Sequence, residues 1–493
     1  MKVLIVVNDP KDWPLAISDV EIVPARAYLT DAAYAEMTSA RVFNLCKSYR
    51  YQSTGYYVSL LAAARGHKPL PDVATIQDFK TQAIIRIASD DLDQIIQQSL
   101  GQIRSPEFVV SIYFGHNVAK RHEKLAQQLF KIFQAPFLRA SFSHNEKEGK
   151  WQLAGITPIA ASDIPEDHRD FAVDMAREYF KGRHRIFHRR RTARYDLAIL
   201  HDPAEAEAPS NAKALQRMVK AAEGVGFAVE FIQKDDYGRL AEFDALFIRE
   251  TTSVLHHTYR FARRAVAEGL VVIDDPESIL RCTNKVFLAE ILTRHRIPIP
   301  KTRIVHSGNW QQLSVELGFP CVLKRPDSSF SQGVVKVGNE AELARELPAL
   351  LQKSELVIAQ EFMPTTYDWR VGIFDGQPLF VCKYFMAPKH WQIIKRDQNG
   401  RKLTDGDAET LPVEHCPPGL IKLALKASAL IGDGLYGVDI KQVGKRFYLI
   451  EINDNPNIDA GVEDKVLKDE LYLRLMRVFA RRVDERKGGG LWA

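Results

Sequence analysis

The chain has 493 residues, of which 46% are apolar and 26% are charged, the composition of an ordinary soluble globular protein. This length is too great for one hydrophobic core and predicts about three domains. A net charge of +5 is small for this size and does not by itself indicate nucleic-acid or membrane binding, and no apolar run reaches membrane-spanning length.

The cysteines and the N-terminus both bear on the compartment. The cysteines, at positions 46, 282, 321, 382 and 416, are widely spaced and odd in number. They form no metal-ligand pair, so we expect reduced thiols. The first ten residues read as a strand and a turn, too short for the apolar core of a signal peptide. We therefore expect a cytoplasmic protein, and a homo-oligomer is left open.

Residues 1–190 are predicted to form one α/β unit. Helical patterns occur around 32–45 and 56–64, and a strand at 108–114 precedes a helix at 120–133. Segments 137–143 and 151–156 flank a turn-like spacer, which indicates a hairpin. Gly55, which begins the second helical pattern, is either a plain turn residue or part of an anion site at a helix N-terminus.

The segment 183–191 is the most basic run in the chain. It lies where the first α/β pattern ends, so a solvated linker face is the favoured interpretation. Attraction of an acidic peptide is the alternative, and nucleic acid is a less favoured partner because the protein as a whole is only mildly basic.

Between residues 195 and 275, strands alternate with helices. Strands are expected at 196–200, 227–232, 244–248 and 270–273, with helices at 211–223 and 258–268. Such alternation predicts a mostly parallel sheet. Open sheets of this kind present ligand-contacting loops at the ends of their strands. The segment 249–252 follows a strand directly and is a candidate for an active-site rim.

Two lysines in the last part of the chain are placed to meet anions. Lys285 stands at the start of a helix capped by Thr283 or Asn284, and a helix N-terminus receives phosphate. Lys324 lies in an apolar strand, where a lysine usually needs an anionic partner. The polar loop 327–333 follows, and its backbone N–H groups can cradle phosphate oxygens. A plain serine-rich hairpin is the alternative for the loop.

The strand at 356–363 ends abruptly at Pro364. Backbone groups exposed beside apolar side chains at such a strand end suit the edge and face of an adenine. Asp368 and Arg370 follow on one face of the next strand. Because arginine stays charged and pairs with carboxylates and phosphates, Arg370 is a candidate to hold a reacting acyl group.

Two strands are predicted at 435–443 and 446–453, joined at Gly444-Lys445. Glu451 and Asn453 share a face of the second strand. A three-residue loop would place Asp439 opposite Glu451 on that face, whereas a two-residue loop would place it on the other. Three buried oxygen-bearing side chains require a cation, and Mg²⁺ prefers such ligands. A solvated hairpin face is the alternative.

Six motifs follow one another along the chain: Asn284-Lys285, Lys324 with its loop, Gln360-Glu361-Phe362, Asp368-x-Arg370, Gly437-Val438-Asp439 and Glu451-x-Asn453-x-x-Pro456. Their order resembles the ATP-grasp superfamily, most closely its RimK-like branch of ribosomal-protein glutamate ligases. The resemblance implies a multidomain α/β protein with a pre-ATP-grasp domain at 195–275 and an ATP-grasp domain at 276–484. Residues 1–190 resemble the additional N-terminal domain of some long RimK-like proteins, which would select a substrate or partner.

The resemblance implies a nucleotide site. Lys285 and Lys324 would contact the phosphates of ATP. The main chain at Glu361 and Phe362 would bind the adenine, and Asp368 would be a further nucleotide contact.

The resemblance also implies two Mg²⁺ ions, with Mn²⁺ as an alternative, held by Asp439, Glu451 and Asn453. Arg370 would be the catalytic residue. Such enzymes convert a carboxylate to an acyl phosphate, which an amine attacks to give an amide, ADP and phosphate. The expected substrates are an amino acid such as glutamate and a peptide, protein or small carboxylate.

The sequence departs from the family pattern in two places. Of the family's glycine-rich phosphate loop only Gly333 is present, and the segment 383–393 replaces an Arg-Ser-Asn-type substrate segment. Lys383 and Lys389 are the candidates to supply the missing cations. A glutathione-synthetase-like ligase of a free dipeptide and a non-catalytic nucleotide-binding module are the alternative functions. Because nucleotide binding alone would not require all three metal ligands and both lysines, the sequence favours the enzyme.

Overall fold

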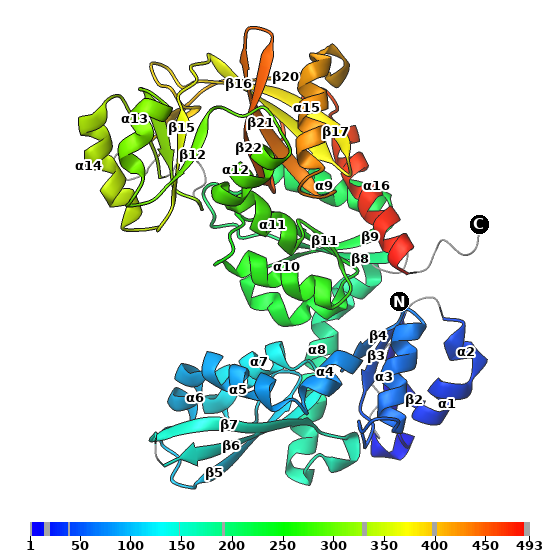
Figure 1. Cartoon of the computed structure of the whole chain (residues 1–493). Coiled ribbons are helices and arrows are strands. Elements are labelled where there is room, and N and C mark those ends of the chain that lie inside the picture. The colour runs from blue at the N-terminus through cyan, green and yellow to red at the C-terminus, as the bar shows by residue number, and fades with distance from the viewer. Residues whose placement is uncertain are drawn as a thin grey trace. The chain divides into compact units, whose positions relative to one another are not determined.

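The computed structural model describes residues 2–13, 20–37, 40–146, 148–189, 193–327, 333–396 and 402–487 (Figure 1). It divides into two compact units, one of Met1–Arg194 with Asp235–Glu242 and one of Tyr195–Lys234 with Phe243–Ala493. The division into three domains, which needs a further boundary near residue 275, stays a prediction. None of the helices in the described ranges has both the length and the apolar character needed to cross a bilayer.

The first unit begins with a parallel sheet of strand order β2-β1-β3-β4. Its central strands are mostly apolar and are buried on both faces, as is typical of parallel strands covered by helices. The strands are β1 (Lys2–Val7), β2 (Val20–Pro24), β3 (Ala40–Asn44) and β4 (Lys68–Leu70), and the helices are α1 (Ala25–Thr30), α2 (Ala32–Ala35), α3 (Thr54–Ala64) and α4 (Val73–Asp78).

The helix predicted around 32–45 is wrong. Only residues 32–35 are helical there, and Ala40–Asn44 form the buried strand β3. Val42 and Phe43, β-branched and aromatic, fit a strand between two neighbours better than a helix. The helix predicted at 56–64 is confirmed as part of α3. Gly55 is explained by close packing, since a Cβ there would lie 2.5 Å from the carbonyl oxygen of Ser48.

The remainder of the first unit is an antiparallel sheet of order β5-β6-β7. Apolar side chains of α5, α6 and α7 pack on it. This confirms the strand at 108–114 and the hairpin that follows the predicted helix. The elements are β5 (Glu107–Tyr113), β6 (Phe137–Asn145), β7 (Lys150–Pro158), α5 (Gln82–Asp91), α6 (Asp93–Leu100), α7 (Glu123–Ile132) and α8 (Arg169–Arg189).

The basic run 183–191 falls partly outside the description. The backbone of α8 continues to Arg189, so the run begins within a helix. Its side chains and residues 190–192 lie outside the described residues. The role of the run therefore stays a prediction.

The second unit begins with the predicted parallel sheet, which has the order β11-β10-β8-β9. Every strand and helix expected between 195 and 275 is confirmed to within a few residues. The elements are β8 (Tyr195–Leu200), α9 (Ala212–Gly224), β9 (Phe227–Ile232), β10 (Ala245–Ile248), α10 (His257–Ala267) and β11 (Val271–Ile273).

Two helices then lead into a small antiparallel sheet of order β12-β15-β13-β14. Helix α14 packs its apolar side on this sheet. The elements are α11 (Pro276–Thr283), α12 (Lys285–Arg294), β12 (Thr302–Val305), α13 (Leu313–Glu316), β13 (Cys321–Lys324), β14 (Val334–Val337), α14 (Glu340–Leu351) and β15 (Val357–Glu361).

The largest antiparallel sheet has the order β20-β17-β16-β21-β22. One of its faces packs on α15 and α12, while the last helix, α16, packs on the parallel sheet. The elements are β16 (Tyr367–Phe374), β17 (Gln377–Phe385), the small hairpin β18 (Ile394–Arg396) and β19 (Lys402–Asp405), β20 (Ala408–Leu411), α15 (Pro418–Ser428), β21 (Leu435–Val443), β22 (Arg446–Asp454) and α16 (Asp469–Arg486).

Short 3-10 helices occur in connections of both units. They are η1 (Pro10–Asp12), η2 (Lys120–His122), η3 (Ala161–Asp163), η4 (Glu166–His168), η6 (Lys234–Glu242), η7 (Trp310–Gln312) and η8 (Val413–His415).

Candidate active site

A cavity of about 850 Å³ in the second unit is lined by strands of both antiparallel sheets and the start of α12. This volume is in the range of small-molecule sites. All the residues predicted to bind nucleotide or metal line it, together with the predicted catalytic arginine. They are Lys285, Lys324, Glu361, Phe362, Asp368, Arg370, Asp439, Glu451 and Asn453.

The hairpin β21–β22 places its three oxygen-bearing side chains on one face through a shift in strand register. The turn has the two residues Gly444 and Lys445, which alone would put Asp439 on the face opposite Glu451. A β-bulge at Ile450 shifts the register, however, so Asp439 stands directly opposite Glu451. The bulge thus replaces the longer loop that the sequence interpretation required.

Each carboxylate of this group has a cationic partner. The Arg370 guanidinium donates to both oxygens of Asp439, at 2.7 and 2.8 Å. The Asn453 amide donates to Asp439 Oδ2 at 3.0 Å, and Lys285 Nζ lies 2.6 Å from Glu451 Oε1. A bidentate arginine pair fixes direction as well as charge, so Asp439 is held rigidly.

Burial and charge act in opposite directions on these carboxylates. Burial raises the pKa of Asp439, and the favourable charge of Arg370 only partly offsets this effect. Burial acts on Glu451 in the same direction, but the nearby ammonium groups of Lys285 and Lys324 outweigh it and lower the pKa of Glu451. Glu451 is therefore a carboxylate at neutral pH and a suitable ligand for a cation.

The two predicted phosphate lysines approach the cavity from different elements. Asn284 caps α12 by accepting hydrogen bonds from the N–H groups of Val286 and Phe287, which places Lys285 in the first turn. Lys324, at the end of β13, donates to Gln360 Oε1 at 2.9 Å. Burial lowers the pKa of Lys324 to about 8, although Glu451 favours its charged form.

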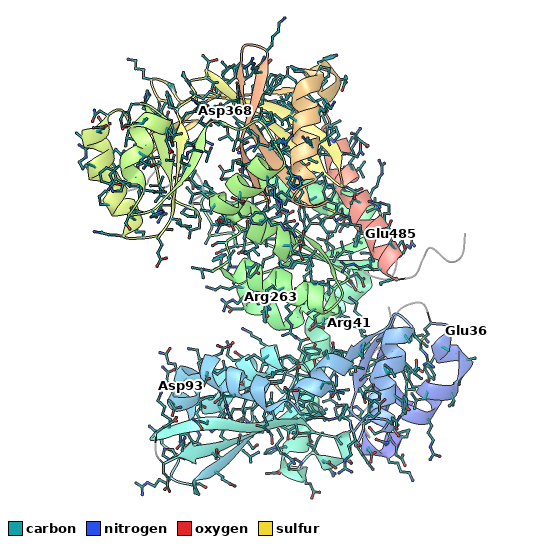
Figure 2. All side chains as sticks on the ribbon, in the orientation of Figure 1. Glu36, Arg41, Asp93, Arg263, Asp368 and Glu485 are labelled. Carbon is teal, nitrogen blue, oxygen red and sulfur yellow. The ribbon has the colours of Figure 1, made fainter. Side chains whose placement is uncertain are left out.

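The cavity also contains a third lysine, Lys441, which was not among the residues predicted from the sequence. Lys441 Nζ donates to Asp368 Oδ1 at 2.6 Å and to Thr365 Oγ1 at 2.7 Å, and Asp368 is labelled in Figure 2. Lys441 and Asp439 lie two positions apart on β21 and so share a face. That spacing was the signal in the sequence that could have identified Lys441.

The other end of the cavity is apolar and aromatic. Phe362 and Trp391 form a T-shaped ring pair with centroids 5.8 Å apart, and Lys336 Nζ lies 4.7 Å from the centroid of Phe362. The N–H groups of Glu361 and Phe362 donate to the carbonyl oxygens of Lys301 and Pro320. Because these two N–H groups are already engaged, an adenine at this strand end would have to form its hydrogen bonds with other backbone groups.

The structure does not bring the two predicted substrate lysines to the cavity. Lys383 lies on the opposite face of β17, where it pairs with Glu409 at 3.1 Å and stacks near the rings of Tyr367 and Trp369. Lys389 is exposed in the following turn. Neither residue lines the cavity.

The predicted phosphate loop is described only at its ends, because residues 328–332 lie outside the described residues. Gly333 has a φ of +68°, a conformation that glycine adopts without strain.

The segment predicted as an active-site rim has a different position. Arg249 is completely buried and clamps the chain just after β22. It donates to Asn455 Oδ1 at 2.7 Å and to the Pro456 carbonyl oxygen at 3.0 Å. Burial lowers the pKa of Arg249 to about 10, which still leaves it charged at neutral pH. Arg249 therefore supports the strand that carries Glu451 and Asn453.

Comparison with known proteins gives a family match and several similar ligases. Residues 25–175 match the RimK-like ATPgrasp N-terminal domain. The α-aminoadipate–LysW ligase LysX of Saccharolobus solfataricus is 32% identical over 195 residues, which cover 38% of this chain and 67% of that protein. The tetrahydromethanopterin:α-L-glutamate ligase of Methanocaldococcus jannaschii is 25% identical over 260 residues, covering 49% and 84%.

Among solved structures, D-alanine–D-alanine ligase from Bacillus anthracis overlaps 60% of this chain and 99% of its own, with 16% identity and a TM-score of 0.47.

The LysX relative shows the class of this chain, which is an ATP-grasp enzyme, an ATP-dependent ligase that forms carbon–nitrogen bonds. Within that class the chain belongs to the RimK-like ligases, and it carries the N-terminal domain named for them.

Proposed function

We propose that the cavity binds ATP and Mg²⁺ and that the enzyme converts a substrate carboxylate to an acyl phosphate, which an amine then attacks to give an amide. The observation that carries the proposal is the convergence of all the predicted ATP and metal residues, with Arg370, on one cavity. Such a site can align the carboxylate with the terminal phosphate and surround the developing charge with cations.

In this proposal the phosphates lie between Lys285 and Lys324. Both lysines already face Glu451, so an incoming triphosphate would exchange one anionic partner for another. Lys441, held by Asp368, adds a third cation near the same end. The adenine would lie against Phe362 at the apolar end and meet backbone carbonyl oxygens at the end of β15.

Asp439, Glu451 and Asn453 are the residues proposed to hold Mg²⁺. Two carboxylates and an amide on one face of the β21–β22 hairpin are hard oxygen donors, the ligand type that Mg²⁺ prefers, so the group fits this ion. The ions would neutralise charge on the transferred phosphate. Two ions, or Mn²⁺ in their place, are part of the proposal.

Arg370 is proposed to stabilise the negative charge that develops when the amine attacks. Its guanidinium lies between Asp439 and the ring of Tyr384, whose centroid is 5.1 Å from the guanidinium carbon. The tyrosine hydroxyl donates to Glu463 and so does not compete for the arginine. A charge fixed in this way requires little rearrangement during reaction.

The proposed substrates are an amino acid such as glutamate and a peptide, protein or small carboxylate. Relatives named for ligating α-aminoadipate or α-L-glutamate support an amino acid as one substrate. A cytoplasmic location remains our expectation.

Residues 1–190 are proposed to select or deliver the second substrate. All the proposed ATP and metal residues lie beyond residue 280. A chain beginning near Thr192 should therefore keep ATP binding but lose kcat/KM with the true substrate. Full kcat/KM in the shortened chain would assign the N-terminal domain another role.

The ligase reaction is tested by measuring ADP release across a panel of amino acids, each with and without peptides as second substrate. We expect Mg²⁺-dependent ADP release that requires both substrates, and mass spectrometry should find the amide product. Product from a free dipeptide alone would favour the glutathione-synthetase-like alternative. Nucleotide binding without turnover on any pair would favour the non-catalytic module.

A further inference from the structure

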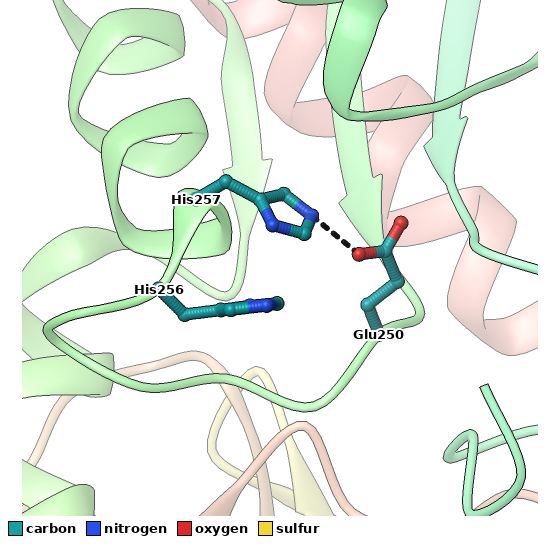
Figure 3. Close-up of side chains that lie close together, drawn as sticks. All are labelled: Glu250, His256 and His257. Atoms are coloured by element: carbon teal, nitrogen blue, oxygen red, sulfur yellow. Dashed lines mark hydrogen bonds and ion pairs between the residues drawn. The ribbon is translucent and has the colours of Figure 1, made fainter.

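A second cluster of titratable side chains lies in the second unit, outside the set that lines the ATP cavity. Glu250 follows β10, and His256 and His257 stand at the start of α10 (Figure 3). One ligand atom of each residue lies within 4.8 Å of the others. The residues that flank the loop 251–255 are therefore close together in space.

The carboxylate of Glu250 is only half satisfied. Its Oε2 atom lies 2.5 Å from His257 Nε2. Its Oε1 atom is buried and has no hydrogen-bond partner within the described part of the chain, and the whole residue is 1% exposed. A buried carboxylate oxygen without a partner is costly, so this atom favours a ligand.

A hollow of about 420 Å³ adjoins the cluster. Asp202 and Glu205 line it together with the three residues, so the hollow has an acidic lining. The Glu205 carboxylate accepts a hydrogen bond from the N–H of Thr251. A cation can therefore reach the cluster and keep water in its remaining coordination positions.

We propose that Glu250, His256 and His257 bind a divalent transition-metal ion of the zinc class at a site separate from the ATP cavity. Two imidazoles with one carboxylate are a common ligand set for Zn²⁺, which takes nitrogen and oxygen donors at four positions. Mg²⁺ prefers oxygen donors alone and would be selected against. The ion would replace the hydrogen bond between His257 and Glu250 and satisfy the buried oxygen.

The site is connected to the end of strand β22. The backbone carbonyl oxygen of Glu250 accepts from the side-chain amide of Asn455 at 2.5 Å, and Arg249 holds the other end of that amide. Asn455 follows Asn453 by two positions. A bound ion would therefore tie the loop after β10 to the strand that carries the proposed Mg²⁺ ligands, and we expect it to raise the midpoint of thermal unfolding.

The test is a Zn²⁺ titration of the untagged full-length protein against a chromophoric chelator, with Mg²⁺ in large excess to occupy the ATP cavity. Wild-type protein should bind one Zn²⁺ per chain. Glu250→Gln and His257→Ala should each weaken binding by at least about tenfold. His295→Ala, which removes an exposed histidine elsewhere in the same unit, is the matched control and should bind like wild type.

Co²⁺ gives a second readout that depends on no variant. Nitrogen and carboxylate ligands in a four-coordinate site should give wild-type protein visible absorption bands, which a stoichiometric amount of Zn²⁺ should remove. Absence of stoichiometric Zn²⁺ binding to wild type would overturn the proposal. Equal Zn²⁺ affinity of wild type and His257→Ala would also overturn it, and loss of binding in Glu451→Gln would place the ion in the ATP cavity instead.

Discussion

The two faces of the sheet β20-β17-β16-β21-β22 differ in the side chains that they bury, which are apolar on one face and largely charged on the other. One face presents Trp369, Val438 and Ile440 to the apolar side chains of α12 and α15. The other presents Arg370, Asp439 and their charged neighbours to the cavity. Strand alternation divides the two sets of side chains, so the same backbone supports a core on one side and a site on the other.

This difference indicates which face of the sheet can gain free energy by binding a charged ligand. The apolar face is stabilised by burial itself, and a ligand could add little there. On the cavity face, charged side chains are paired with opposite charges, as in Arg370–Asp439 and Lys285–Glu451. Lys324 instead donates to the neutral side chain of Gln360. A nucleotide with its metal ions can exchange these partners without leaving a charge unpaired, and this is why we assign the chemistry to that face.

The largest expected effect is that of Glu451→Gln. The change is nearly isosteric but removes one charge from the proposed metal ligands, so Mg²⁺-dependent ADP formation should fall by about 100-fold or more. Glu409→Gln is the matched control, because Glu409 pairs with Lys383 on the opposite face. Thermal unfolding would check that both variants are folded. Unchanged turnover in Glu451→Gln would exclude Glu451 as a metal ligand.

Two cations of the cavity face should differ in the kinetic constant they affect. Lys324→Ala should raise the Kd for ATP by about 10- to 100-fold, because a phosphate would lose a charged donor. Arg370→Ala should instead lower kcat by about 100-fold, because its charge matters most after the amine attacks. Steady-state kinetics with direct nucleotide-binding measurements separate the two. Our assignment of Arg370 would be wrong if its loss raised only the KM for ATP.

ATP affinity should depend on pH through Lys324. Its pKa is lowered to about 8, so the free protein carries the charged lysine below pH 8 and loses that charge as the pH rises. Bound phosphate favours the charged form, and the Kd for ATP should therefore rise by up to roughly tenfold per pH unit above 8. Isothermal titration between pH 7 and 9 measures this slope. Lys324→Ala should remove it, and an equal slope in that variant would assign the titration to another group.

The smallest effect is expected on the opposite face. Lys383→Ala should change kcat/KM by less than about twofold, because Lys383 contacts Glu409 and two rings away from the cavity. Lys389→Ala should behave alike, since that residue is exposed. A large loss of activity in either variant would show that the segment 383–393 contributes to substrate binding.

Which side chains share a face of this sheet could be predicted from the sequence only where strand alternation is regular. Positions tied to strand alternation, such as Asp368 with Arg370 and Glu451 with Asn453, were assigned to a common face correctly. The bulge at Ile450 could not be predicted, because a bulge is a tertiary adjustment that adds no distinctive residue. Lys383 is a candidate because of its charge and its place in the segment 383–393, and neither of these indicates which face of the sheet it occupies.

Two other differences have local causes. The segment 40–44 continues a helical pattern, but its β-branched and aromatic residues favour a strand, and its place between two strands adds to that preference. The cluster at Glu250 joins residues on two sides of a loop, and its ligands become neighbours only when the loop closes. The order of strands and helices from 195 to 275 was predictable because each element carries its own period and end signals.

The central claim is that the cavity converts a carboxylate to an acyl phosphate. It is tested most directly by supplying the carboxylate substrate selected by the ADP-release screen with ¹⁸O in both carboxyl oxygens and analysing the released phosphate by mass spectrometry. Transfer through an acyl phosphate predicts one labelled oxygen in each phosphate, formed together with ADP. Unlabelled phosphate, or label recovered in AMP, would contradict the proposed reaction.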